Sequence, residues 1–288
     1  MRFSLLLLVA LVPFVGRAEM LIVGSDLIAP AVQPIIKAYA EHNGISIETD
    51  FAGSIPATDA LQSGKASLAI LAAPKESDLP AGNFRHLPIA YEVAFVVVDK
   101  LNPITEISLD QLAGIYGAGS EYNLTRWGEL GVQGPMSSRS IKAVCLENGE
   151  SVVTEMFKYT ALDSGSLKPT VSLIADNLQV NDIASSDTGA IAITNKVLLK
   201  EKLRPLLVSG GKEESYAFGP TPENIHYGDY PLRLSFYLIY QREKQDELLP
   251  LIRSLLGSEQ AEALTKAGFV PVPENIRKRT LVELDKGS

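Results

Sequence analysis

The chain has 288 residues, of which 46% are hydrophobic and 21% are charged, so its composition is that of a globular protein rather than a disordered one. The formal net charge is −8 and no run of basic residues occurs, which argues against binding of nucleic acid or of an anionic membrane surface. The single cysteine, Cys145, has no partner for an internal disulfide and is expected to be buried, because it lies in an apolar run.

Residues 1–18 predict a secretory signal. Arg2 provides a short basic region, and residues 3–15 form an apolar region that is too short to span a bilayer. Gly16 and Ala18 place small residues at positions −3 and −1 of a cut after Ala18. We therefore expect an exported chain, periplasmic or secreted, that begins at residue 19.

The exported chain opens with a strand, a polar turn and a helix. Residues 21–23 are apolar and predict a buried parallel strand, and Gly24, Ser25 and Asp26 form the turn. Apolar residues then recur with helical spacing at Val32, Ile35, Ile36 and Tyr39. The unpaired N–H groups of such a helix start can hold an anion or a polar ligand. The alternative is an ordinary capped helix in an α/β domain.

The same pattern follows a second time. Residues 45–48 alternate as in a strand, and Gly53 and Ser54 open a second helix, with Ser54 as the candidate N-cap. Residues 67–71 predict a third strand, which ends at Ala72. This order predicts a parallel sheet with helices on its faces, and both polar turns follow the carboxyl ends of strands, where open α/β sheets bind ligands.

A second domain is predicted between two crossovers. The β-type run 91–99 leads into it, and the β-type run 230–240 leads back. Within it, residues 141–146 predict a strand, residues 147–151 a third polar turn, and residues 152–162 a helix.

With three such turns placed, most of residues 20–275 resembles the periplasmic phosphate-binding proteins of ABC importers, the PstS type. The likeness is carried by these segments in this order: Gly24-Ser25 with Ala29-Pro30, Gly53-Ser54 with Ala60-Leu61, Ala66 to Pro74, Asn102-Pro103-Ile104, Leu109 to Tyr116, Trp127, Tyr230-Pro231-Leu232, and Gly268 to Pro271. The resemblance implies an α/β fold of the two-lobed periplasmic-binding-protein type II class, each lobe a mixed, mostly parallel sheet flanked by helices. Lobe 1 is expected over 19–91 plus 230–288, and lobe 2 over 92–229.

The resemblance also implies a ligand site between the lobes, formed by serine hydroxyls and backbone N–H groups. The expected ligand-binding residues are Ser25, Asp26, Leu27, Gly53, Ser54, Ala72, Glu150 and Ser151.

Several positions depart from the family's phosphate cage. Leu27 stands where the family has a Thr, Ala72 where it has an Asp that accepts the proton of bound phosphate, and Glu147 near its Arg. Further along the third turn, Glu150 and Val152 occupy glycine positions, and Val153 the position of a Thr. One like-charge pair at 4 Å costs about 4 kcal/mol at an effective dielectric near 20, nearly a thousandfold in affinity. If the acidic groups of this turn face the cleft, they favour a neutral or cationic ligand over phosphate. The alternative is that Glu147 and Glu150 belong to a solvated turn or interact with the helix dipole. Arg139 lies in what reads as a surface turn.

The sequence thus predicts an extracytoplasmic solute-binding protein that binds phosphate or another small polar solute. The expected partner is the membrane complex of an ABC importer, and the chain is expected to be a monomer. The alternative is a degenerate relative that acts through protein–protein interaction without transport. An enzyme is not expected, because the three histidines lie in unrelated segments, each is expected at the surface, and no nucleophile motif occurs. No metal or other cofactor is expected either.

Overall fold

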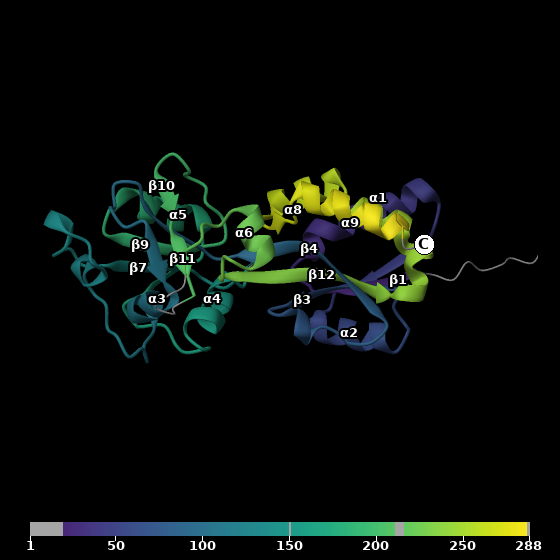
Figure 1. The fold of residues 1–288 in the computed structure, drawn as a ribbon, viewed down its shortest axis with the longest axis horizontal. Coiled ribbons are helices and arrows are strands. Elements are labelled where there is room, and N and C mark those ends of the chain that lie inside the picture. The colour runs from purple at the N-terminus through teal and green to yellow at the C-terminus, as the bar shows by residue number, and fades with distance from the viewer. Residues whose placement is uncertain (1–19, 150, 211–215, 287–288) are drawn as a thin grey trace, which may run out of the picture.

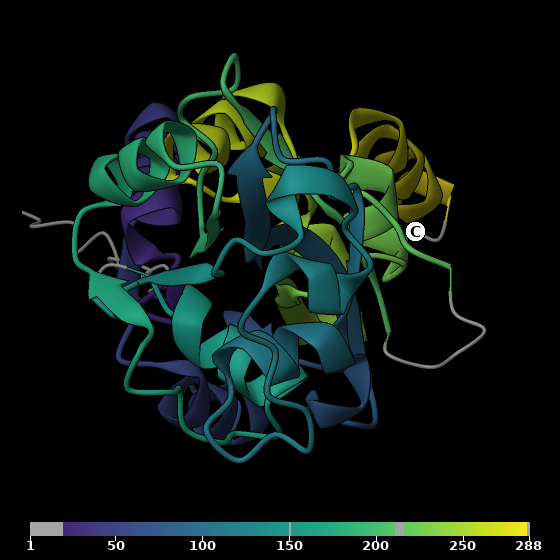
Figure 2. The ribbon, with the colours of Figure 1, turned by 90° about the vertical axis from the view of Figure 1, so that its left-hand side faces the viewer.

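The computed structural model describes residues 20–149, 151–210 and 216–286, so the predicted signal segment 1–18 lies outside the described residues. Two α/β units lie side by side along the long axis of the molecule (Figure 1). Figure 2 views it along that axis, with the second unit in front and the C-terminal helices behind.

The first unit is built on a six-stranded mixed sheet. Its strands, in spatial order, are β13 (Val270–Pro271), β4 (Phe84–Val93), β12 (Arg233–Gln241), β3 (Leu68–Ala73), β1 (Met20–Gly24) and β2 (Ile47–Asp50). Strand β1 pairs in parallel with β2 and β3, whereas β12 is antiparallel to both β3 and β4. Its helices are α1 (Ala29–Asn43), α2 (Ser54–Gln62), α7 (Gln245–Leu255), α8 (Ser258–Ala267) and α9 (Glu274–Lys286).

Both faces of this sheet are covered, which explains why its central strands read as continuous apolar runs. In β3, Leu68 and Ile70 belong to the buried cluster that also contains residues of α1 and α7, while Ala69 and Leu71 belong to the cluster that contains residues of α2. Successive side chains of a strand point to opposite faces, so one apolar run supplies two layers of core.

The second unit is built on a five-stranded sheet. Its strands, in spatial order, are β10 (Leu203–Pro205), β5 (Phe95–Asp99), β9 (Ala190–Thr194), β7 (Lys142–Leu146) and β8 (Ser172–Ile174). A small parallel pair joins β6 (Glu106–Ser108) and β11 (Leu207–Ser209). The helices of this part of the chain are α3 (Leu109–Tyr116), α4 (Val153–Ala161), α5 (Asn177–Ser186) and α6 (Pro222–Tyr227).

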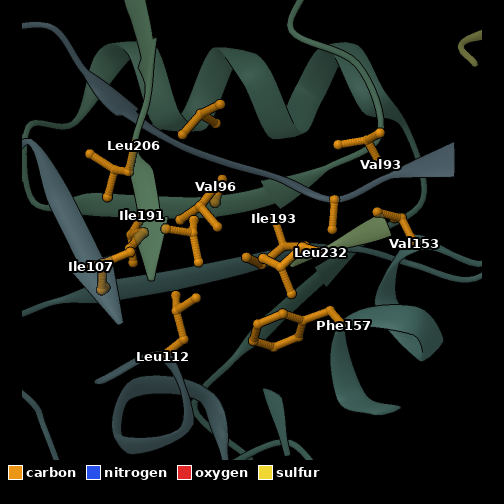
Figure 3. Packing of buried hydrophobic residues seen from close by; sticks show 14 of the residues in the cluster. Val93, Val96, Ile107, Leu112, Val153, Phe157, Ile191, Ile193, Leu206 and Leu232 are labelled. Carbon is orange, nitrogen blue, oxygen red and sulfur yellow. The ribbon is translucent and has the colours of Figure 1, made fainter. Parts of the chain in front are cut away.

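The core of the second unit lies between this sheet and its helices (Figure 3). Leu112 of α3 and Phe157 of α4 pack with Ile191 and Ile193 of β9 in one buried cluster. Cys145 belongs to the same cluster and is fully buried, as the sequence predicts, and burial raises the pKa of its thiol.

Two neighbouring connections link the units. The predicted run 91–99 is two strands rather than one, because Ala94 leaves the first sheet and donates its N–H to the carbonyl of Leu232, at 3.0 Å. Tyr230 on the returning segment donates its hydroxyl to the carbonyl of Ala94, at 2.8 Å, so the two connections are bonded to each other. The lobe boundaries given above, 19–91 plus 230–288 and 92–229, stay a prediction.

The predicted N-cap at Ser54 is wrong. Gly53 is the N-cap residue of α2, with φ 119°, a left-handed conformation that glycine adopts without strain. Its N–H is bonded to the carbonyl of Gly24, at 3.0 Å, so the chain turns at Gly53 and Ser54 becomes the first helical residue. The second strand also lies later than expected, at 47–50 instead of 45–48.

Candidate functional site

Two clefts lie between the units, one on each side of the start of α4. The larger cleft, about 690 Å³, is lined by Pro74, Lys75, Val152, Glu155, Met156, Tyr159, Thr160, Asp163, Ser164, Gly228, Pro231, Arg233 and Leu234. The second, about 480 Å³, is lined by Asp26, Leu27, Pro30, Glu92, Gly149, Asn195, Ala267, Gly268 and Phe269. We call the second one the acidic cleft, because Asp26 and Glu92 are the only charged residues among the described residues that line it.

The first predicted loop reaches the acidic cleft. The chain turns sharply after β1, where a side chain on Gly24 would come within 2.7 Å of both the Ile70 carbonyl and the Phe51 ring. This turn buries Ser25 and leaves Asp26 exposed and Leu27 half-buried, and the last two line the cleft. The side chain of Asp26 is exposed and has no hydrogen-bond partner among the described residues, so its carboxylate is open to a solute.

The second predicted loop is tied to the end of β3 instead. The hydroxyl oxygen of Ser54 accepts a hydrogen bond from the backbone N–H of Ala72, at 3.0 Å. Neither residue lines the acidic cleft, and nor do Ser25 and Gly53. The N–H of Ala72 is therefore already used within the protein.

The third predicted turn brings Ser151 to a residue that the sequence analysis missed. Ser151 is buried, and its hydroxyl donates to a carboxylate oxygen of Glu92, the next-to-last residue of β4. The same hydroxyl oxygen accepts from the N–H of Val153, at 3.1 Å. Burial raises the pKa of Glu92, and hydrogen bonds from Ser151 and from the backbone of Val152 partly oppose the rise. The sequence signal that could have pointed to Glu92 is that it is a single acidic residue inside the apolar run 91–98.

The remaining positions of this turn contribute no cation. Glu147 is exposed at the end of β7, Val153 is buried in the core (Figure 3), and Glu150 lies outside the described residues. Arg139 lies at the opposite, amino end of β7, where it pairs with Asp187 at 2.6 Å and donates to Thr188 at 2.8 Å. Its assignment to a surface turn is consistent with these partners.

Lys75 and Arg233 line the larger cleft, together with Glu155 and Asp163, so that surface has mixed charge. The guanidinium of Arg233 lies 5.2 Å from the centre of the Tyr91 ring. His86 and His226 are half-buried rather than at the surface as expected, and the ring of His226 bonds the Tyr91 hydroxyl at 2.8 Å. Burial and then Arg233 lower the pKa of His226.

Neither a metal site nor a membrane span is found in the part of the chain that the structure describes. No group of three or more His, Cys, Asp or Glu side chains there is arranged to hold a metal ion. None of the described helices combines the length and the apolar character that crossing a membrane requires.

The comparison with known protein families shows to which family the chain belongs. The family described as "PBP superfamily domain" matches residues 16–264 of this chain. The chain belongs to this family. It is 25% identical over 279 residues to the phosphate-binding protein PstS of Pseudomonas aeruginosa, which covers 91% of this chain and 85% of the relative. It is 25% identical over 267 residues to the protein SphX of Synechococcus elongatus, covering 87% and 76%.

Solved structures show the same two-lobed fold. A possible phosphate-binding protein from Planctomyces limnophilus matches with a TM-score of 0.69 at 16% identity, covering 92% of this chain and 96% of that one. PstS from Borrelia burgdorferi matches with a TM-score of 0.69 at 18% identity, covering 88% and 99%. An ABC-type phosphate transport receptor from Vibrio cholerae matches with a TM-score of 0.62 at 20% identity, covering 88% and 99%. The fold predicted from the sequence is confirmed.

Proposed function

We propose that this chain is an extracytoplasmic solute-binding protein, related to the phosphate-binding component of ABC importers, that holds phosphate or another small polar solute in the acidic cleft. The observation that carries the proposal is the composition of that cleft. Asp26 and Leu27 come from the first unit, whereas Gly149 and Asn195 come from the second, so a solute between them contacts both. The similarity to PstS over 91% of the chain supports it.

Binding would be coupled to movement of the two units. Solute-binding proteins of two lobes close around a ligand by rotation about a few connecting residues. In this chain the connections at Ala94 and Leu232 lie side by side, which suits rotation about one axis. The closed form would then be the form that a membrane complex of an ABC importer recognises, in the periplasm or outside the cell.

A role in binding rather than catalysis is supported by the similar proteins, whose names describe a phosphate-binding protein and a phosphate transport receptor. The histidines also lie apart: His86 bonds the Pro80 carbonyl at 2.9 Å, His226 bonds Tyr91, and His42 is exposed on α1. Among the described residues, none of the three is hydrogen-bonded to a Ser, Thr or Cys side chain, so no histidine-activated nucleophile of that kind is formed there.

One observation favours a second candidate function, protein binding without transport. The polar groups around the predicted cage are bonded within the protein, as Ala72 is to Ser54 and Ser151 is to Glu92. In such a chain the fold is kept, but the hydrogen-bond donors of the expected ligand site bond other groups of the same protein. The fold could then serve to recognise another protein instead of a small solute.

Calorimetric and thermal-shift titration of the purified chain with phosphate, sulfate, amino acids and polyamines separates these candidates. A ligand at a hundred times its Kd raises the unfolding free energy by about 2.7 kcal/mol. Asn195→Trp fills the acidic cleft without breaking a described hydrogen bond, and Tyr159→Trp is the matched control in the larger cleft. Binding that is lost in N195W and kept in Y159W supports the proposal. No binding of any of these solutes refutes it in favour of protein binding.

A further inference from the structure

The larger cleft, which the proposed function leaves unused, has its charges divided between its two walls. Its described cations, Lys75 and Arg233, come from the first unit, after β3 and at the start of β12. Its described carboxylates, Glu155 and Asp163, come from the second unit, in the first turn of α4 and just after its end. One wall is therefore positive and the other negative, and no ion pair joins these four groups across the cleft.

The cations of the positive wall are open to a ligand. Arg233 is half-buried and held in place, because its guanidinium donates to the carbonyl of His226, at 3.1 Å, and lies 5.2 Å from the centre of the Tyr91 ring. Lys75 is exposed, and within the described chain neither cation has a carboxylate at ion-pair distance. Such cations suit the carboxylate of a ligand, and a guanidinium whose position is already fixed loses little side-chain entropy on binding it.

The negative wall is one face of α4, on which Glu155 and Tyr159 lie one helical turn apart. Glu155 already pairs with Lys158, at 2.9 Å. Asp163 follows the helix with φ 47°, a left-handed conformation that aspartate adopts more readily than most residues. It is exposed, and its carboxylate has no partner in the described part of the chain. Asp163 is thus the group of this wall that is open to a cation.

Between the charged groups the cleft is apolar. Met156 and Tyr159 of α4 line it from one side and Pro231 and Leu234 from the other, and Tyr159 is 51% exposed. A nine-residue helix is about 13 Å long, and three residues of extended peptide span about 10 Å. The volume of about 690 Å³ is within the range of clefts that enclose organic ligands. These dimensions fit a short peptide better than an inorganic ion.

An inorganic oxyanion would pair with Lys75 and Arg233 and leave Asp163 without a partner, whereas a zwitterion has a group for each wall. We propose that the larger cleft is a second binding site, for zwitterionic peptides of about three residues, whose carboxylate pairs with Lys75 and Arg233 and whose ammonium group pairs with Asp163. This site goes beyond the solute proposed for the acidic cleft and does not depend on what binds there.

Titration calorimetry near pH 7 with tri-L-alanine tests this site. The same peptide is also used N-acetylated, without the ammonium group, C-terminally amidated, without the carboxylate, and with both ends blocked. The variants are Lys75→Gln and Asp163→Asn, both at exposed positions, and asparagine tolerates the left-handed conformation as aspartate does. Lys65→Gln and Asp182→Asn are the matched controls, because these residues are exposed on the same two units and line neither cleft.

The wild type is expected to bind trialanine about tenfold or more tightly than the peptide with both ends blocked. K75Q should weaken trialanine binding about three- to fivefold and leave the affinity for the amidated peptide unchanged, since that peptide has no carboxylate to lose a partner. D163N should weaken trialanine binding by a similar factor and leave the affinity for the acetylated peptide unchanged. The two controls, and Asn195→Trp in the acidic cleft, should stay within about twofold of the wild type.

Absence of trialanine binding, or equal binding of the peptide with both ends blocked, would overturn the inference. So would losses in K75Q and D163N that are the same for every peptide, or a loss in Asn195→Trp, which would place the peptide in the acidic cleft. These failures are distinct from a failure of the proposed function. A wild type that binds phosphate but no trialanine keeps that function and removes the second site. Trialanine binding that only the larger cleft supports, with no solute bound in the acidic cleft, keeps the second site and removes that function.

Discussion

Replacing Ser151 by alanine should lower the unfolding free energy more than replacing an exposed serine does. The size of the loss should depend on pH. The hydroxyl is buried, donates to Glu92 and accepts from the N–H of Val153. Loss of a hydroxyl that satisfies a helix-start N–H costs about 1 kcal/mol. Loss of a buried hydrogen bond to a charged group costs about 1.5–3 kcal/mol. Together we expect S151A to lower the unfolding free energy by about 2–4 kcal/mol near neutral pH.

The pH dependence follows from the raised pKa of Glu92. A carboxyl whose pKa is raised by folding holds its proton more tightly in the folded state than in the unfolded state. The unfolding free energy therefore falls as pH rises from the pKa of an unfolded glutamate through the raised pKa of Glu92. Removing the Ser151 donor raises that pKa further, because the hydrogen bond lowers it. The difference between the wild type and S151A should accordingly grow with pH.

Urea unfolding of both proteins near pH 5 and near pH 8 measures this difference, with Ser137→Ala as the control. Ser137 lies in a short turn and is half-exposed. Its hydroxyl donates to the Gly134 carbonyl, at 2.7 Å. We expect S137A to cost less than about 0.5 kcal/mol at both pH values. The reasoning is refuted if S151A costs no more than S137A, or if its cost is larger near pH 5 than near pH 8.

Three further predictions concern positions away from Glu92. Gly24→Ala should lower the unfolding free energy by about 1–3 kcal/mol in urea and weaken solute binding, because the added methyl group meets backbone and ring atoms and shifts the first loop. An unchanged urea midpoint would contradict the close packing of other atoms around Gly24. Cys145 should resist a thiol reagent near pH 8 in the folded protein and react once urea unfolds it, because burial raises the pKa of its thiol; rapid labelling of the native protein would argue against its burial. Arg139→Ala should leave solute affinity within about twofold in calorimetry, since its guanidinium is paired with Asp187 at the other end of β7; a large loss would place Arg139 in the site.

The regular elements follow from the sequence wherever apolar periodicity and turn residues agree. The helix expected over 152–162 spans Val153–Ala161, and the strand expected over 141–146 spans Lys142–Leu146. Strand β4 was harder to predict, because Pro88 interrupts its pattern and the strand begins at Phe84. The structure accommodates this proline beside a register shift between β4 and β12, where Ile89 of β4 has no facing partner, a position where a missing N–H does least harm to a sheet.

The break between β4 and β5 could not be found from local sequence. Residues on both sides of Ala94 favour strands, and no glycine or proline marks the junction. The chain divides there because Ala94 bonds the returning segment at Leu232, far away in the sequence. Such a contact exists only once the whole fold has formed, so a reading of local pattern merges the two strands into one.

The candidate site shows the same limit. Asp26 and Leu27 follow a recognisable strand end, and the structure places both at the acidic cleft. Glu92, Asn195 and Gly268 come from three distant segments that share no motif, and only the crossing of the two units brings them together. Their involvement could be expected only from the fold.

Three of the positions expected to form the phosphate cage share one property: their groups are buried or are hydrogen-bonded within the protein. Val153 is buried in the core, the N–H of Ala72 is bonded to Ser54, and the hydroxyl of Ser151, just before α4, is bonded to Glu92. Among the described side chains of the acidic cleft, the carboxylate of Asp26 and the amide of Asn195 make no hydrogen bond within the protein. A solute that offers donors to the Asp26 carboxylate and complements the Asn195 amide would satisfy both groups, and this gives a physical basis for choosing which compounds to titrate first.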